Sequence, residues 1–351
     1  MQVGCRKLWP AMSTPRPART APSLMDLPIP EAARRVTLAQ VDRWIDQAAR
    51  LGKPDDPEAL HDYRTAIRRL RSLIRYFQTW LPEVPRGTRR KLRRLMALTG
   101  QSRDLEVFRI WIGERQAGLT VRQHPGTRWL LERLMRRSSH ADELMLGRLG
   151  RRATKLQRKL RAAVRRGAPE ASRRPGTPRA GPVIRRLVRR EAALLSRRLG
   201  AIHSLANRAE IHRARIAAKR VRYLIEPFQG ELLAGSLLVE RLHELQNRFG
   251  AVTDVHAAAD ELREALVVAG ASRASRVGQE LLPWPSARPE APSSPPAPRN
   301  AQSGLLALAR ELRREGDLSF ARLREWIETN WSEVEQMLER AGRIGSRGGR
   351  I

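Results

Sequence analysis

The strongest constraint on the fold of this chain is an internal repeat. Residues 61–77 (HDYRTAIRRLRSLIRYF) align without a gap with residues 212–228 (HRARIAAKRVRYLIEPF). Each copy continues into a stretch with a glycine followed, four residues later, by an aspartate: Gly100 and Asp104 in the first copy, Gly250 and Asp254 in the second. A repeat of this length indicates a duplicated structural unit. We therefore expect two related halves rather than one continuous solenoid.

Apolar residues recur at three- and four-residue spacing along most of the sequence, which is the period of an amphipathic helix. No stretch alternates between apolar and polar residues as a half-buried strand does. Helices are predicted over 31–51, 58–80, 88–98, 103–117, 127–165, 183–205, 208–229, 235–248, 254–282, 304–315 and 319–342. The predicted fold is all-α, with two pseudo-two-fold-related four-helix bundles that arose by internal duplication.

Segments rich in proline and glycine divide the helical regions, because both residues interrupt helices. Residues 1–30 contain six prolines and no hydrophobic period, which is typical of a disordered leader. The predicted organisation is a leader over 1–30, an N-terminal bundle over 31–166, a linker over 167–182, a C-terminal bundle over 183–342 with a proline-rich insertion at 283–304, and a basic tail over 343–351.

The chain carries 68 Lys and Arg against 36 Asp and Glu, a formal net charge of +32. So large a charge opposes compaction unless an anionic partner offsets it. Only six of the basic residues are lysines, and an arginine bias of this kind can follow from genome composition. The placement of the cations on helix faces is therefore better evidence than their number.

Several protein classes are disfavoured by what the sequence lacks. The single cysteine, Cys5, allows neither an internal disulfide nor a cysteine-based metal site. No run of 18 apolar residues occurs, and the N-terminal residues do not resemble a signal peptide. We expect a cytoplasmic protein without a membrane span, a metal or another cofactor.

Each repeated helix is predicted to carry a cationic stripe beside an apolar stripe. In the first copy the stripe residues follow one another at intervals of three and four, which places them on one helix face. The cationic residues are His61, Arg64, Arg68, Arg71 and Arg75 in the first copy, and His212, Arg215, Lys219 and Arg222 in the second, with Arg69 and Arg220 widening the stripes. Glu226 stands in the second copy where Arg75 stands in the first.

A row of like charges costs about 0.2–0.5 kcal/mol per neighbouring pair on a helix. Phosphate groups would compensate this cost, because guanidinium groups bind their oxygens in bidentate fashion. A histidine that heads the stripe would gain a proton beside a polyanion, so binding would strengthen as pH falls. A single arginine-rich face is usually just a solvated surface, whereas two copies in the same register favour a binding site. Asp104 and Asp254 are interpreted as structural, ion-pairing residues rather than catalysts.

These motifs resemble the CHAD domain, the conserved histidine α-helical domain, over roughly residues 31–342. The residues that carry the resemblance are His61, Asp62, Arg64, Arg68, Arg69, Arg71, Gly100, Arg103 and Asp104, then His212, Arg215, Lys219, Arg220, Arg222, Tyr223, Leu245, Gln246, Gly250 and Asp254. The resemblance implies paired four-helix bundles around a basic groove, non-catalytic binding of inorganic polyphosphate by the stripe residues, and recruitment to polyphosphate granules.

Two other functions stay open at this point. Non-specific binding of DNA or RNA is the stronger alternative, because a nucleic-acid backbone also attracts a row of cations. Aromatic residues, which stack on bases, make up only 5% of the chain. A role in polyphosphate or triphosphate processing is weaker, since the sequence has no phosphate-binding glycine loop and no paired metal-binding motif. The sequence leaves the oligomeric state undetermined.

Overall fold

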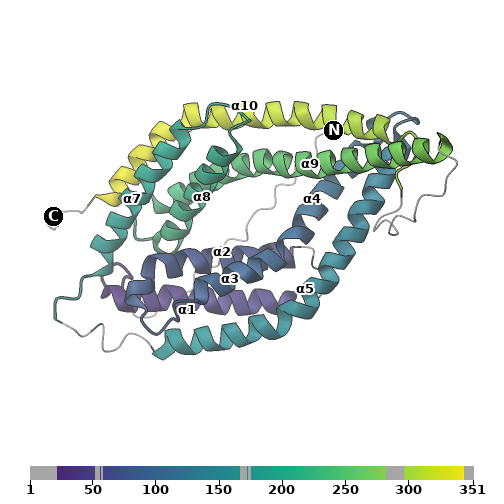
Figure 1. Cartoon of the computed structure of the whole chain (residues 1–351). Coiled ribbons are helices and arrows are strands. Elements are labelled where there is room, and N and C mark those ends of the chain that lie inside the picture. The colour runs from purple at the N-terminus through teal and green to yellow at the C-terminus, as the bar shows by residue number, and fades with distance from the viewer. Residues whose placement is uncertain are drawn as a thin grey trace.

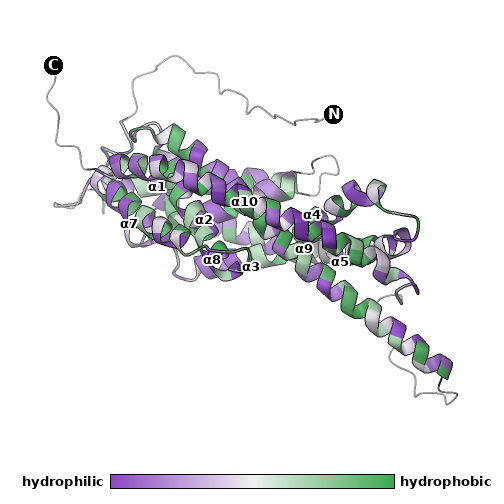
Figure 2. Ribbon diagram, turned by 90° about the horizontal axis from the view of Figure 1, so that it is seen from above, coloured by the Kyte–Doolittle hydropathy of each residue, from purple (hydrophilic) through white to green (hydrophobic). Residues whose placement is uncertain are grey.

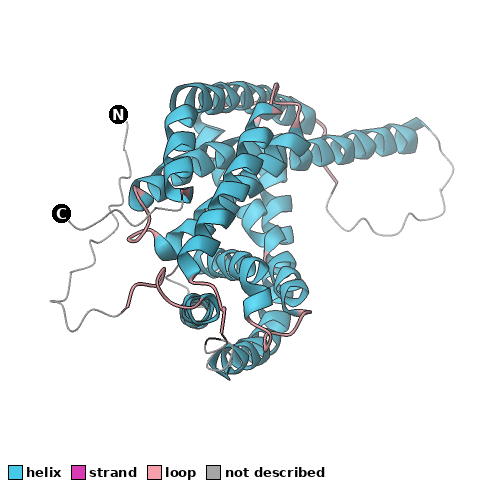
Figure 3. Cartoon of the chain, turned by 90° about the vertical axis from the view of Figure 1, so that its left-hand side faces the viewer, coloured by secondary structure: helices cyan, strands magenta, loops and turns pink. Residues whose placement is uncertain are grey.

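The computed structural model describes residues 22–51, 56, 58–166, 172, 175–281 and 296–343, without the side chains of residues 101–104 and 140–149. All regular elements in this part of the chain are helices, as Figure 3 shows. An isolated antiparallel bridge joins Pro28 to Arg179. For these residues, the prediction of an all-α protein is confirmed.

The helices fall on either side of the segment around residue 170. Before it lie α1 (Ile29–Arg50), α2 (Ala59–Phe77), α3 (Thr88–Leu98), α4 (Gly100–Arg115) and α5 (His124–Arg166). After it lie α7 (Ala180–Gly200), α8 (Arg208–Ile225), α9 (Gly235–Leu281) and α10 (Ala301–Gly342). Three short 3₁₀ turns follow α2, α4 and α8, at Gln78–Trp80, Gln116–Gly118 and Glu226–Phe228.

The two sets of helices pack in corresponding ways. Helix α1 packs on α2 and α5, and α7 packs on α8 and α10. Helix α4 pairs with α5, and α9 pairs with α10. Contacts between α2 and α8, and between α5 and α10, join the two sets (Figure 1). The correspondence supports the duplication, while the division into two four-helix bundles stays a prediction.

Two predicted helix boundaries in the second half are wrong. The segments predicted as separate helices are continuous: 235–248 with 254–282 in α9, and 304–315 with 319–342 in α10. A glycine inside a helix costs about 1 kcal/mol relative to alanine, which explains the predicted breaks. Packing overrides this preference at Gly316, where an added Cβ would lie 3.0 Å from Leu205 Cδ2.

The end of the predicted leader and the end of the predicted linker are ordered and form hydrogen bonds with each other. The backbone N–H of Ile29 donates to the Pro178 carbonyl (2.9 Å), and that of Ala180 donates to Leu27 (2.8 Å). Helix α1 therefore begins at Ile29, and α7 begins inside the predicted linker 167–182. The N–H groups of Leu24 and Met25 donate to the Glu231 carboxylate, so residues 22–28 are held against the second half. Residues 1–21, 282–295 and 344–351 lie outside the described residues.

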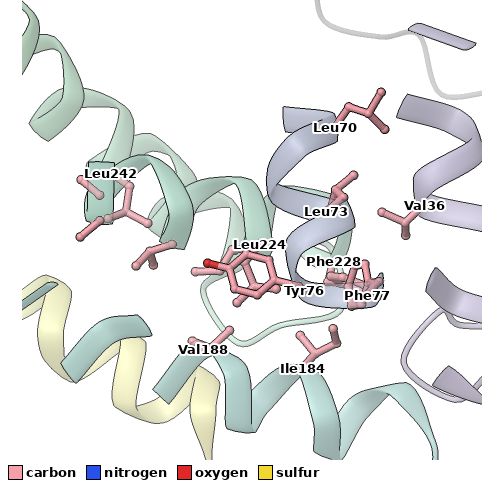
Figure 4. Close-up of a cluster of buried hydrophobic side chains, with 14 of the residues drawn as sticks. Val36, Leu70, Leu73, Tyr76, Phe77, Ile184, Val188, Leu224, Phe228 and Leu242 are labelled. Atoms are coloured by element: carbon pink, nitrogen blue, oxygen red, sulfur yellow. The ribbon is translucent and has the colours of Figure 1, made fainter. Parts of the chain in front are cut away.

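One buried hydrophobic cluster contains residues from both halves of the chain. Figure 4 shows Leu73, Tyr76 and Phe77 of α2 lying close to Ile184 and Val188 of α7 and Leu224 of α8. A second cluster, at the other end of the molecule, is built from α4, α5, α9 and α10. The contact between α2 and α8 is therefore fixed by burial of apolar surface, which holds their neighbouring cationic faces in place.

Figure 2 shows hydrophilic and hydrophobic residues alternating along the helices. The C-terminal end of α9 projects beyond the other helices in the same view, and Val277 and Leu281 there are exposed. Among the described residues, no helix is both long enough and apolar enough to cross a membrane.

Candidate polyanion-binding site

The structure brings the two predicted stripes together where α2 and α8 contact each other. Arg68 and Lys219 occupy matching positions in the repeat, and the charge of Arg68 acts on Lys219. Both side chains are half-buried. Arg68 Nη2 donates to Thr65 Oγ1 (2.8 Å), while its Nε is buried without a hydrogen-bond partner in the described part of the chain. We refer to Arg68 and Lys219 as the central pair.

Lys219 is held in an environment that disfavours its charge. Burial, followed by the positive charges of Arg215, Arg68 and Arg222, lowers the pKa of Lys219 to about 6. Asp254 opposes this shift, so it lies near the Lys219 ammonium group and partly offsets the cations. The interpretation of Asp254 as an ion-pairing residue is consistent with that position, although it lies inside α9 rather than at a helix start. The side chain of Asp104 lies outside the described residues.

On one side of the central pair, five arginines form what we call the basic cluster. Its members are Arg71 and Arg75 of α2, Arg89 and Arg93 of α3, and Arg220 of α8. Burial and like-charge neighbours lower the pKa of both Arg71 and Arg220. No carboxylate within the described residues forms an ion pair with any of the five. The charge of the buried Glu191 reaches Arg220, but its carboxylate is paired with Arg190 at 3.0 Å.

On the other side, the cations are partly neutralised in what we call the paired cluster, Arg69, Arg222, Glu226 and His243. The Arg69 guanidinium donates two hydrogen bonds to Glu226, at 2.8 and 2.9 Å. Arg222 Nε lies 3.5 Å from the same carboxylate. Arg222 Nη1 lies 2.8 Å from His243 Nδ1, and because a guanidinium only donates, this nitrogen accepts. Both guanidinium groups also lie over the Tyr223 ring, at 5.7 and 5.1 Å from its centroid.

The four remaining predicted residues lie nearer the N-terminal ends of α2 and α8. His61 and His212 are exposed, and Arg64 and Arg215 are half-buried. Arg64 donates to the Thr99 carbonyl and, at 3.2 Å, to Thr99 Oγ1, which ties α2 to the start of α4. Desolvation, then Arg215 and Lys219, lower the pKa of His212. Of the predicted residues, Arg68, Arg71, Arg75, Lys219 and Arg220 form the part of the site richest in unpaired charge.

Sequence reasoning missed Arg89, Arg93 and His243 as members of this site. Arg89 and Arg93 are four residues apart on the exposed face of α3 and are flanked by further cations. That spacing was the available signal, since it places both side chains on one helix face. The sequence could not indicate that the charge of Arg89 reaches Arg220 of α8, because their separation depends on tertiary packing.

Cavities in the described part of the chain also lie outside the stripes. One of about 340 Å³ lies between α9 and α10 and is lined by Glu244, Asn247, Arg248, Ala251, Glu315, Ser319 and Arg322. Another, of about 330 Å³, is lined by Arg185, Leu233, Arg340, Ala341 and Arg343. The described residues contain no group of three or more His, Cys, Asp or Glu side chains that could hold a metal ion.

Comparison with known proteins agrees with this architecture. The family model of the CHAD domain matches residues 35–263, so the chain belongs to the CHAD domain family. The crystal structure of the CHAD domain from the plant Ricinus communis is similar over 94% of this chain and 99% of its own, with 20% identity and a TM-score of 0.59. PptA from Streptomyces chartreusis is similar over 86% of this chain and 100% of its own, with 18% identity and a TM-score of 0.61. At these identities the two structures establish the shared fold. No curated protein matches the sequence.

Proposed function

We propose that this protein binds inorganic polyphosphate without processing it, and that this binding recruits it to polyphosphate granules. In this proposal, two pseudo-two-fold-related helical bundles hold the ligand in a basic groove along the contact of α2 and α8. The observation that carries the proposal is the basic cluster beside the central pair, where arginines from α2, α3 and α8 gather without an ion-paired carboxylate among the described residues. Family membership supports the choice of polyphosphate.

A linear polyanion suits this arrangement for electrostatic reasons. Burial first, and then repulsion between neighbouring cations, lowers the pKa values of Lys219, Arg71 and Arg220. Phosphate oxygens would remove the repulsion and provide acceptors for the guanidinium groups. A flexible polyphosphate chain can place each of its phosphates beside a cation. A rigid duplex holds its phosphates in fixed positions, so fewer of them can reach the cations.

The same surface is less suited to binding a nucleic acid. Binding of single strands usually relies on aromatic rings on which bases stack. Tyr76 and Tyr223 lie among these cations, but they are only 8% and 4% exposed, and Tyr223 is covered by Arg69 and Arg222. Without a stacking surface here, base contacts would contribute little to affinity, and the phosphate charge would be the main attraction.

A competition experiment at physiological salt tests the proposal. Labelled long-chain polyphosphate bound to the full chain is challenged with unlabelled polyphosphate, duplex DNA or single-stranded RNA at equal phosphate concentration. We expect polyphosphate to displace the label at concentrations at least about tenfold lower than either nucleic acid. Equal displacement by all three would replace the proposal with non-specific polyanion binding, and release of phosphate in the presence of Mg²⁺ would show that the protein is an enzyme.

Polyphosphate binding is expected to weaken as pH rises from about 6 to 8. The lowered pKa of Lys219, about 6, means that the free protein has largely lost this proton at pH 8. A bound polyanion raises the pKa again, so binding takes up a proton and affinity falls up to about tenfold per pH unit. The variant Lys219→Arg keeps its charge and should show a flatter pH profile.

The matched control for this experiment is Lys159→Arg, which makes the same substitution at an exposed position of α5. It should keep the pH profile of the wild-type chain and corrects for titration of the polyphosphate ends. If Lys219→Arg and Lys159→Arg give the same slope, Lys219 does not take up a proton on binding.

A further inference from the structure

The two sides of the central pair are related by the repeat, and they differ in charge. Arg75 in the basic cluster matches Glu226 in the paired cluster, and Arg71 matches Arg222. Counting back from Gly100 and Gly250, Arg93 of α3 matches His243 of α9, and Arg89 matches Val239. Of these four pairs, only Arg71 and Arg222 carry a cation on both sides, whereas the other three arginines face a carboxylate, a histidine and a valine at the equivalent positions.

The hydrogen bonds of the paired cluster show that its arginines are already held by protein side chains. Glu226 receives two bonds from Arg69 and lies 3.5 Å from Arg222, so one carboxylate holds two guanidinium groups. His243 accepts from Arg222 at 2.8 Å, and Glu244 lies beside it on α9. Arg222 is only 8% exposed. These cations already have partners, and a phosphate would have to displace them.

The basic cluster, in contrast, is accessible to a ligand, because its arginines are more exposed and have no ion-pair partners among the described residues. Arg75, Arg89 and Arg93 are exposed, and Arg71 and Arg220 are half-buried. No carboxylate in the described part of the chain is paired with these five arginines. A phosphate could reach them without breaking an ion pair, and its charge would relieve their mutual repulsion.

We propose that the two ends of the site differ in function. The basic cluster is the anchoring end for a polyphosphate chain, and Glu226 closes the opposite end. This inference rests on the proposed function and adds to it a residue that sets how much of a polymer the site can hold. Glu226 limits the length of bound chain by holding Arg69 and Arg222, the two cations that would otherwise extend the site past Lys219.

The inference is tested with two probes, inorganic tripolyphosphate and long-chain polyphosphate, and the substitution Glu226→Gln in the full chain. The amide removes the negative charge and keeps the size of the side chain, which removes the ion pairs of Arg69 and Arg222, while Arg222 keeps its contact with His243. We expect the ratio of long-chain to tripolyphosphate affinity to rise about tenfold, which corresponds to about one additional strong phosphate contact. The salt dependence of long-chain binding should also become steeper.

Glu280→Gln is the matched control. Glu280 is paired with Arg299 at 2.5 Å near the far end of α9, so the substitution makes the same change in net charge away from the site. Its affinity ratio should equal that of the wild-type chain. If Glu226→Gln gives no larger ratio than Glu280→Gln, Glu226 does not close the site.

The anchoring end is tested separately with Arg75→Gln and its control Arg158→Gln, an exposed arginine of α5. Arg75→Gln should weaken tripolyphosphate binding about tenfold. An effect no larger than that of Arg158→Gln would overturn the assignment of the anchoring end. Failure of the wild-type chain to bind either probe would overturn the proposed function and this inference together, whereas binding with unchanged ratios would overturn only the inference.

Discussion

Simultaneous replacement of Arg68 and Lys219 by glutamine is expected to weaken polyphosphate binding by at least about 100-fold. Each cation would lose a charge-assisted hydrogen bond of about 1.5–3 kcal/mol, and 1.4 kcal/mol corresponds to a factor of ten in affinity. The central pair lies where α2 and α8 meet, so the loss affects the middle of the proposed groove. Titration of labelled polyphosphate into the purified variant measures the effect.

The same double variant is expected to be at least as stable as the wild-type chain. Lys219 has a lowered pKa in the folded protein, so folding must release a proton or accept a buried charge below its ordinary pKa of 10.5. The free energy of unfolding therefore falls as pH drops from about 10 to about 6, and the lost stability stays absent below pH 6. Removing the ammonium group removes this dependence, and thermal unfolding at pH 7 should show an unchanged or higher Tm.

The matched control is Arg158→Gln with Lys159→Gln, which removes one arginine and one lysine from the exposed face of α5. It removes the same two residue types and should reduce affinity only a few-fold, through the general field of the protein. Equal losses of polyphosphate affinity in the two double variants would mean that the binding site is not at the central pair.

Replacing Gly126 and Gly304 together by alanine is expected to lower the free energy of unfolding by about 2–6 kcal/mol. These glycines lie near the starts of α5 and α10, where the two helices cross backbone to backbone. A Cβ on Gly126 would lie 2.1 Å from the Ala301 carbonyl oxygen, and one on Gly304 would lie 2.1 Å from that of Gln123. Because backbone atoms cannot rotate away, the helices would have to separate.

The separation would loosen the second hydrophobic cluster, which contains Trp129 and Leu130 of α5 and Leu305 and Leu308 of α10. Denaturant unfolding followed by circular dichroism measures the loss. The control is Gly270→Ala with Gly278→Ala in α9, where an added Cβ meets nothing within 4 Å. That variant should gain up to about 2 kcal/mol from helix propensity. A gain in both double variants would show that α5 and α10 do not cross so closely.

The spacing of charges along α2 and α8 was enough to predict most of the candidate site. Intervals of three and four residues place His61 to Arg75 on one face of a helix whatever the rest of the chain does. Adjacent apolar residues such as Ile67 and Leu70 are fully buried, so the prediction that the cationic stripe borders a core stripe is confirmed.

The division of the stripes into functional parts could not be predicted in this way. Arg69 and Arg71 are only two positions apart, yet Arg69 binds Glu226 while Arg71 joins the arginines of α3. The difference depends on which helix lies against each side of α2. Likewise, the breaks predicted between 248 and 254 and between 315 and 319 are absent, because α9 and α10 continue through Gly250 and Gly316.

The sequence by itself determined the helical class, the repeat and the register of the cations, because these follow from local periodicity within single segments. Tertiary structure alone decided which cations come together from α2, α3 and α8, and that a single carboxylate, Glu226, pairs with two arginines on one side of the site. The physical reason is that electrostatic energy depends on distances between side chains, and packing of apolar faces sets those distances for residues far apart in the chain.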